Sequence, residues 1–193
     1  MKNKKILSAM KQRYVMFAIL FSLLATMPVW SQTQIIRRIP VEVKSQKSSQ
    51  LARKIAGCKY VTYQNKGYGY TFKYPDFMVK YVDKMGMDDD SKGIVLSWNN
   101  QVAINSWVDE AGGDTPQTLW NTLKENKDIR YTYHRIIGNT LFSSGYMPNG
   151  NILYDKWVFK DGLIYSVSLE YPVGNKKDMD DVVKKVAASL KTL

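Results

Sequence analysis

Few residues in this chain of 193 could perform acid–base or metal chemistry. It has one histidine, His134, and one cysteine, Cys58. A serine–histidine–acid relay needs a nucleophile, a base and a group that orients the base, and no Gly-x-Ser-x-Gly turn marks a nucleophile here. A typical zinc site needs more cysteine and histidine ligands than one of each. His134 shares a predicted strand face with Arg130 and Thr132, and we interpret it as a structural or solvent-facing residue.

An acidic stretch, "DDDSKG" at 88–93, has part of the composition of a calcium-binding loop. Lys92 occupies the fifth position, where oxygen is needed, and Asn99 occupies the twelfth, where glutamate is typical. We interpret the stretch as a solvated loop, with a weak surface calcium site as the alternative. Gly67 and Gly69 are too few for a phosphate-binding loop, and no helix follows them. We therefore expect no metal and no cofactor.

Aromatic residues are the remaining candidates, because exposed rings can bind sugars, apolar ligands or a protein partner. The chain has five tryptophans and thirteen tyrosines. Trp120 has helical spacing to Leu123 and is predicted to be a core residue. The candidate ligand or partner surface consists of Trp98, Trp107, Trp157 and Tyr146.

The stretch "KGYGYTFKYPDF" carries four aromatic residues at two-residue spacing: Tyr68, Tyr70, Phe72 and Tyr74. Small and polar residues fill the positions between them. Because alternate side chains of a strand point to opposite faces, this pattern predicts a strand with one face in the core. A ligand-stacking surface is the alternative.

Alternating segments bounded by turn residues predict an antiparallel β-sheet. Asn99-Asn100 suits the positive φ of a tight hairpin turn, and Thr115 with Pro116 suits the start of a helix. In the segment 163–171 the odd-numbered residues are bulky and most even-numbered ones polar, which predicts a half-buried strand. The predicted strands are 60–64, 68–74, 78–82, 93–98, 101–107, 129–137, 140–146, 152–159 and 163–171.

The last segment changes to helical spacing. Apolar residues recur at i, i+3, i+4, i+7 from Met179 to Leu190, with aspartates at the start and lysines towards the end, as the helix dipole favours. This predicts an amphipathic helix over 177–190 whose apolar face covers the sheet. The fold class is therefore α+β, an antiparallel sheet covered by helices.

Residues 1–31 have the organisation of a secretory signal peptide. Five basic residues precede an apolar run, Val15–Val29, and small residues precede an expected cleavage after Ser31, next to Gln32. An uncleaved anchor is the alternative, although the run is short for a membrane span. The mature chain is expected to be periplasmic or extracellular. "IAGC" at 55–58 resembles a lipoprotein box but lies far from the apolar run, so Cys58 is not expected to be acylated.

The net charge of +11 is concentrated at the N-terminus. Residues 1–31 contribute +5, residues 32–59 contribute +6, and residues 60–193 are neutral overall. A domain that binds nucleic acid needs a basic patch of its own, so we do not expect that partner. Residues 32–59 are predicted to be a disordered polar linker, with a weak membrane tether as the alternative. Residues 60–193 are predicted to form a single domain, and one cysteine allows no intrachain disulfide.

Three pieces in this order resemble the Mog1/PsbP-like family. They are Gly69–Pro75 ("GYTFKYP"), Ser144-Gly145 followed by Ile152–Tyr154, and Gly162–Pro172 leading into "VVKKVAASLK". The resemblance spans about 60–193 and implies an α/β/α sandwich, mostly without catalytic activity. The family provides no active-site residues to transfer, and it includes exported bacterial proteins of unknown role.

We therefore expect an exported, non-enzymatic binding or accessory domain that contacts another envelope protein. The first alternative is a small-ligand binder that uses an aromatic cleft between sheet and helix. The second is a hydrolase that uses His134, for which the sequence shows no catalytic set.

Overall fold

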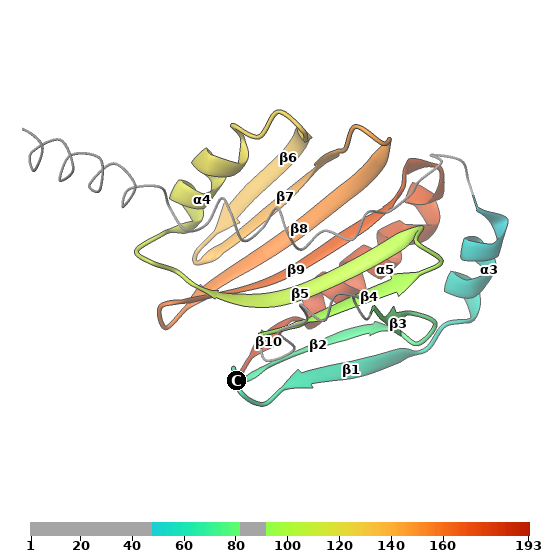
Figure 1. Ribbon diagram of the computed structural model, residues 1–193, viewed down its shortest axis with the longest axis horizontal. Coiled ribbons are helices and arrows are strands. Elements are labelled where there is room, and N and C mark those ends of the chain that lie inside the picture. The colour runs from blue at the N-terminus through green and yellow to red at the C-terminus, as the bar shows by residue number, and fades with distance from the viewer. Residues whose placement is uncertain (1–47, 82–91) are drawn as a thin grey trace, which may run out of the picture. The chain divides into compact units, whose positions relative to one another are not determined.

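The computed structural model describes residues 48–81 and 92–193, which fall within one compact unit (Figure 1). The predicted signal peptide, residues 32–47 of the predicted linker and residues 88–91 of the acidic stretch lie outside the described residues. None of the described helices is long and apolar enough to span a membrane.

Seven strands form the larger sheet, in the order β3-β4-β5-β9-β8-β7-β6, and every neighbouring pair is antiparallel. Tight turns join β6 to β7 and β8 to β9, because their sequences carry glycine between alternating segments. The strands are β3 (Val79–Lys80), β4 (Ile94–Trp98), β5 (Val102–Glu110), β6 (Arg130–Ile137), β7 (Thr140–Tyr146), β8 (Asn151–Lys160) and β9 (Leu163–Pro172).

A second, three-stranded sheet has the order β1-β2-β10 and is also antiparallel. It contains β1 (Tyr60–Asn65), β2 (Tyr70–Pro75) and β10 (Lys191–Thr192). The helices are α3 (Ser49–Gly57), α4 (Pro116–Leu123) and α5 (Lys176–Ser189), with a short 3-10 turn, η1 (Val173–Asn175), before α5. The predicted fold class is confirmed, with two antiparallel sheets where the sequence indicated one.

The aromatic strand β2 lies in the core, as its spacing predicts. Tyr70 and Phe72 are fully buried, and Tyr68 and Tyr74 are half-buried and pack against the same core. The Tyr70 ring meets the Tyr165 ring of β9 edge-on, with centroids 5.8 Å apart. This contact joins the small sheet to the large one without a helix between them.

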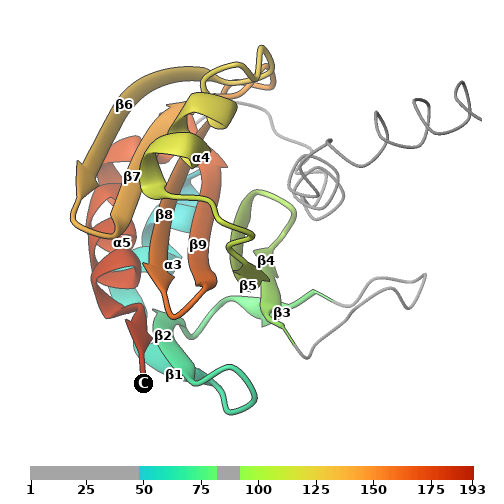
Figure 2. The same cartoon turned by 90° about the vertical axis from the view of Figure 1, so that its left-hand side faces the viewer.

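Helix α5 covers β2, β9 and part of β8 (Figure 2). Its buried residues are Met179, Val182, Val183, Val186 and Ala187, the positions that the helical spacing predicts. The odd-numbered residues of β9 from Tyr165 to Tyr171 lie in the same core. The amphipathic helix and its place on the sheet are therefore confirmed.

Local signals also form the elements they predict. Asn99 and Asn100 both have positive φ in the turn between β4 and β5. Thr115 caps α4 by accepting a hydrogen bond from the Thr118 amide, and Pro116 is the first helical residue. Trp120, predicted to be core, is only half-buried.

The linker prediction is wrong for residues 48–57, which form α3 and its cap. The Ser48 hydroxyl accepts a hydrogen bond from the Leu51 amide, and Leu51 is fully buried in the core. The Asn175 side chain accepts from the Ser48 amide at 2.8 Å and donates to its carbonyl at 3.0 Å. A nine-residue helix is marginal alone, so it depends on these tertiary contacts, which its sparse apolar pattern does not reveal.

The prediction that β9 is half-buried is also wrong. Ile164, Ser166 and Glu170, on the face opposite α5, are buried as well. β9 lies between β5 and β8, whose large side chains flank these positions, so a central strand is covered on both faces.

Candidate functional site

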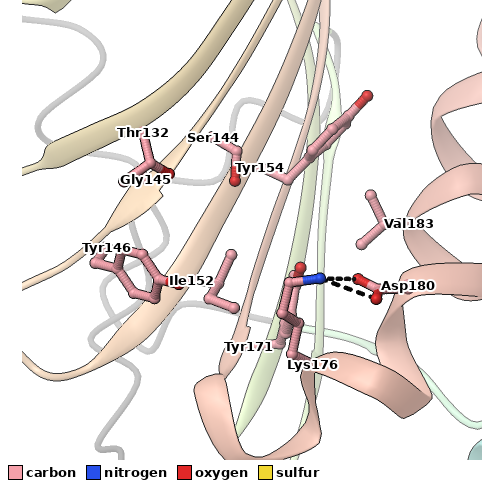
Figure 3. Close-up of a pocket in the computed structure, with 10 residues that line it drawn as sticks. All are labelled: Thr132, Ser144, Gly145, Tyr146, Ile152, Tyr154, Tyr171, Lys176, Asp180 and Val183. Atoms are coloured by element: carbon pink, nitrogen blue, oxygen red, sulfur yellow. Dashed lines mark hydrogen bonds and ion pairs between the residues drawn. The ribbon is translucent and has the colours of Figure 1, made fainter.

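A cleft opens where α5 stops covering the large sheet, between the helix and strands β6 to β8 (Figure 3). Its volume is about 210 Å³. Tyr146, Tyr154 and Tyr171 supply its aromatic lining, and Lys176 and Asp180 of α5 supply its charged lining.

Strand register brings the three tyrosines to one face. Tyr146 of β7 pairs with Ile152 of β8, and Ile152 pairs with Tyr171 of β9. In the next row, Tyr154 pairs with Ser144, whose small side chain leaves space beside the ring. The Ser144 hydroxyl donates to the Leu153 carbonyl at 2.9 Å, so it is held against its own sheet. The cleft is the space above this small residue.

Two tyrosines of the cleft, Tyr154 and Tyr171, are neutral phenols at physiological pH. Burial, with smaller effects of Tyr133 and Asp155, raises the pKa of Tyr154 to about 12. Burial, followed by the nearby Asp180 carboxylate, also raises the pKa of Tyr171. Neutral hydroxyl groups both donate and accept hydrogen bonds but do not act as bases at pH 7.

Charged groups stand at the mouth of the cleft. The Lys176 ammonium contacts both Asp180 carboxylate oxygens, at 2.8 and 2.9 Å, and both side chains are about half exposed. An exposed pair of this kind contributes little to stability. The Arg130 guanidinium lies 4.8 Å from the centre of the Tyr146 ring and braces it by a cation–π contact. This arrangement suits an apolar or aromatic group with a polar edge.

The structure does not bring the four predicted surface residues together. Tyr146 lines the cleft, whereas Trp98 is buried at the other end of the sheet, edge-on to Phe77. Trp107 and Trp157 lie on the opposite face, each beside Ser166, and are 8% and 2% exposed. The position of each residue within its own strand gave no information about the register between strands, and this register decides which residues lie together.

The predicted face of His134 is wrong because β6 contains a bulge between Tyr131 and Tyr133. The extra residue reverses the alternation, so His134 lies with Tyr131 rather than with Thr132. Its ring stacks on Trp120 of α4, with centroids 4.0 Å apart and planes 7° apart.

The face of His134 carries a row of polar residues across the sheet. Register places His134 beside Ser143, and Ser143 beside the buried Asp155. A catalytic relay needs the histidine between the serine and the acid. Here the serine is in the middle, and the His134 side chain forms no hydrogen bond with any residue that the structure describes. This geometry does not support the hydrolase alternative.

Sequence reasoning missed Tyr154, Tyr171 and Thr132 as lining residues of the cleft. Tyr154 and Tyr171 lie in strands that are 10 residues long, and nothing in the sequence of those strands distinguishes them from core residues. Only the register between β7, β8 and β9 shows that they share a surface. A hollow of about 470 Å³ beside α3, with Arg53 and Lys54, was also unforeseen.

Within the described residues, no group of three or more histidine, cysteine, aspartate or glutamate side chains could hold a metal ion. Cys58 is a half-buried free thiol, and burial followed by the Asp76 carboxylate raises its pKa. A raised pKa disfavours the reactive thiolate.

Comparison with known proteins gives a match in structure only. No protein-family model and no curated protein matches the sequence. The chain is similar to cyanobacterial PsbP (CyanoP) from Synechocystis sp. PCC 6803, with a TM-score of 0.51, 13% identity, and coverage of 69% of this chain and 92% of that one. It has a PsbP-like fold. This confirms the fold that the Mog1/PsbP-like resemblance implied.

Two further solved structures match with lower TM-scores. A protein from Bacteroides thetaiotaomicron VPI-5482 matches with a TM-score of 0.44 and 13% identity, over 68% of this chain and 48% of that one. LpqN, involved in cell envelope biogenesis of Mycobacterium tuberculosis, matches with a TM-score of 0.42 and 12% identity, over 77% and 99%.

Proposed function

We propose that this protein is an exported, non-catalytic accessory domain of the bacterial cell envelope that binds a protein partner. The cleft beside α5 takes up one side chain of that partner. The observation that carries the proposal is the set of three tyrosines, Tyr146, Tyr154 and Tyr171, around an open hollow between α5 and the large sheet. Export rests on the basic and apolar N-terminal segments of the sequence.

The size of the cleft favours a side chain over a whole cofactor. Sites for drug-sized ligands are typically about 300–1,000 Å³. A volume of about 210 Å³ has room for one ring or one branched side chain. Aromatic anchors with polar edges are also the residues that dominate protein–protein contacts.

The chemistry of the lining supports binding without catalysis. Ser144 is the lining residue that most resembles the nucleophile of a hydrolase, and its hydroxyl donates a hydrogen bond to the Leu153 carbonyl. The hydroxyls of Tyr154 and Tyr171 keep their protons at neutral pH. A small free ligand with an aromatic or sugar ring is the second candidate, favoured by the same aromatic lining.

Site-specific photocrosslinking in the producing cell tests this function. Asp180 and Asp181 are neighbours on α5 and both are exposed, but only Asp180 lines the cleft. We expect p-benzoylphenylalanine at position 180 of the full chain to give a discrete protein adduct, and the same group at 181 to give none.

A matched variant then ties the adduct to the cleft. Tyr154→Ala should abolish the adduct at position 180, whereas Tyr60→Ala, a half-buried tyrosine on β1 outside the cleft, should preserve it. Identical adducts from 180 and 181, or no protein adduct at 180, would contradict the proposed function. A small-molecule adduct at 180 would support the second candidate.

A further inference from the structure

The two ends of the large sheet differ in how they are protected. At one end the edge strand β3 has only two residues, so it offers few backbone groups with which another strand could pair. At the other end β6 has eight residues, and among the residues that the structure describes it pairs with β7 alone (Figure 1). Such an edge strand directs a row of backbone amide and carbonyl groups away from the sheet, where another strand can pair with them.

Two of the exposed side chains of β6 are large and apolar. Tyr133 is 47% exposed and Ile137 is 52% exposed, and both are among the few large apolar side chains that are exposed in the described residues. Register places Tyr133, Arg135 and Ile137 on the α5 side of the sheet, opposite Ser144, Phe142 and Thr140. On this face the edge strand therefore carries an apolar side chain, then a basic one, then a second apolar one.

The charge of this edge has one sign. β6 and β7 together contain two arginines, Arg130 and Arg135, and no carboxylate. Neither arginine forms an ion pair with any residue that the structure describes. A second copy of β6 would bring more positive charge to the same edge, whereas an acidic strand would balance it.

We infer that β6 accepts an extended acidic segment of the partner protein as an eighth strand of the large sheet. Its alternate residues would be apolar, acidic and apolar, to meet Ile137, Arg135 and Tyr133. The inference rests on the proposed function in one respect, namely that the partner is a protein. Thr132 of β6 lines the cleft, so an added strand would run beside it and could direct a neighbouring side chain into it.

Peptide binding to the full exported chain tests the inference. The probe is the acetylated and amidated heptapeptide Thr-Val-Thr-Glu-Thr-Val-Thr, and its control has lysine in place of glutamate. We expect the glutamate peptide to bind about fivefold more tightly, the scale of a changed cross-strand charge pair. Arg135→Glu should reverse this preference, whereas Arg53→Glu on α3, the same change at an exposed distant site, should leave it intact.

Backbone methylation of the probe separates strand addition from simple charge attraction. N-methyl groups on one alternate set of peptide residues should abolish binding, and those on the other set should be tolerated, because only one edge of the peptide pairs with β6. Amides of β6 should exchange more slowly with deuterium in the complex.

Several results would overturn the inference: equal binding of both peptides, equal effects of the two methylated sets, or a β6-mediated dimer of the chain in sedimentation. The two proposals can fail separately. No adduct at position 180 together with normal peptide binding would contradict the role of the cleft and leave strand addition intact. An adduct at position 180 together with no peptide binding would contradict strand addition and leave the role of the cleft intact.

Discussion

The two ends of this sandwich use one face of the same sheet in opposite ways. At the closed end, formed by β2, β9 and α5, side chains such as Phe72, Leu169 and Val186 are fully buried. At the open end, formed by β6, β7 and the adjoining part of β8, Tyr133 and Ile137 are about half exposed. The closed end supplies stability, and the open end leaves large apolar side chains exposed.

Helix width explains why both ends exist. A helix with its side chains is about 10–12 Å across, and strands lie about 4.8 Å apart, so one helix covers about two strands. α5 and the small sheet together cover only part of a seven-stranded sheet. No described helix covers β6 and β7 on that face, because α4 packs on the other side, against His134.

The largest expected effect is on stability at the closed end. Phe72→Ala should lower the free energy of unfolding by about 3–5 kcal/mol, because it leaves a cavity in a core that cannot collapse around it. Tyr133→Ala, also an aromatic truncation but at the open end, should change it by less than about 0.5 kcal/mol. Denaturant unfolding followed by tryptophan fluorescence measures both. Similar losses would contradict the distinction between the two ends.

The next effect concerns α3, which joins the closed end through Leu51. Leu51→Ala should cost about 2–3 kcal/mol, at the low end for a buried leucine, because α3 can detach without unfolding the sheets. Lys54→Ala, on the exposed side of the helix, should have almost no effect. Circular dichroism during denaturant unfolding measures both variants. Unchanged stability in Leu51→Ala would show that residues 48–57 belong to the linker and do not pack on the core.

A smaller effect is expected where the open end is held in place. A Cβ at Gly145 would lie 2.8 Å from the Arg130 carbonyl oxygen and 2.9 Å from the Tyr131 Cα, so Gly145→Ala must displace β6. We expect a loss of about 1–3 kcal/mol, as for other overpacked sites. Gly57→Ala is the matched control, because no atom beyond its chain neighbours and its own helix backbone lies within 4 Å of the added Cβ. Chemical shifts of β6 amides should move in the first variant only.

The smallest effect is a dependence on alkaline pH. Folding raises the pKa of Tyr154 and of Tyr60 from 10.0 to about 12, mainly through burial, so the folded state keeps protons that the unfolded state loses. The stability from these groups is complete below pH 10 and is lost as the pH rises from 10 to 12. Tyr154→Phe should flatten this decline when unfolding is measured between pH 8 and pH 11.5. An unchanged slope would show that Tyr154 is solvated.

Elements whose signals are local followed from the sequence. Alternation in β2 identified Tyr70 and Phe72 as core residues, and the helical stripe of α5 identified Met179 and Val186. The hairpin at Asn99-Asn100 and the cap at Thr115 needed only the preferences of neighbouring residues. In each case the deciding interactions lie within a few positions along the chain.

Features that depend on contacts between residues far apart in the chain did not follow from the sequence. The bulge in β6 moved His134 to the other face, and no residue type in that strand marks it. Helix α3 is fixed by Asn175, which is 127 positions away. The same limit applies to the cleft, because Tyr146, Tyr154 and Tyr171 become neighbours only when three strands take their register.

The sequence alone therefore determined which segments are strands or helices and which side of each is apolar, since these properties repeat with the period of the backbone. The tertiary structure decided which faces stay uncovered, because coverage depends on the width of a helix against the width of a sheet. It also decided which tyrosines meet, because pairing between strands sets the distance between residues far apart in sequence.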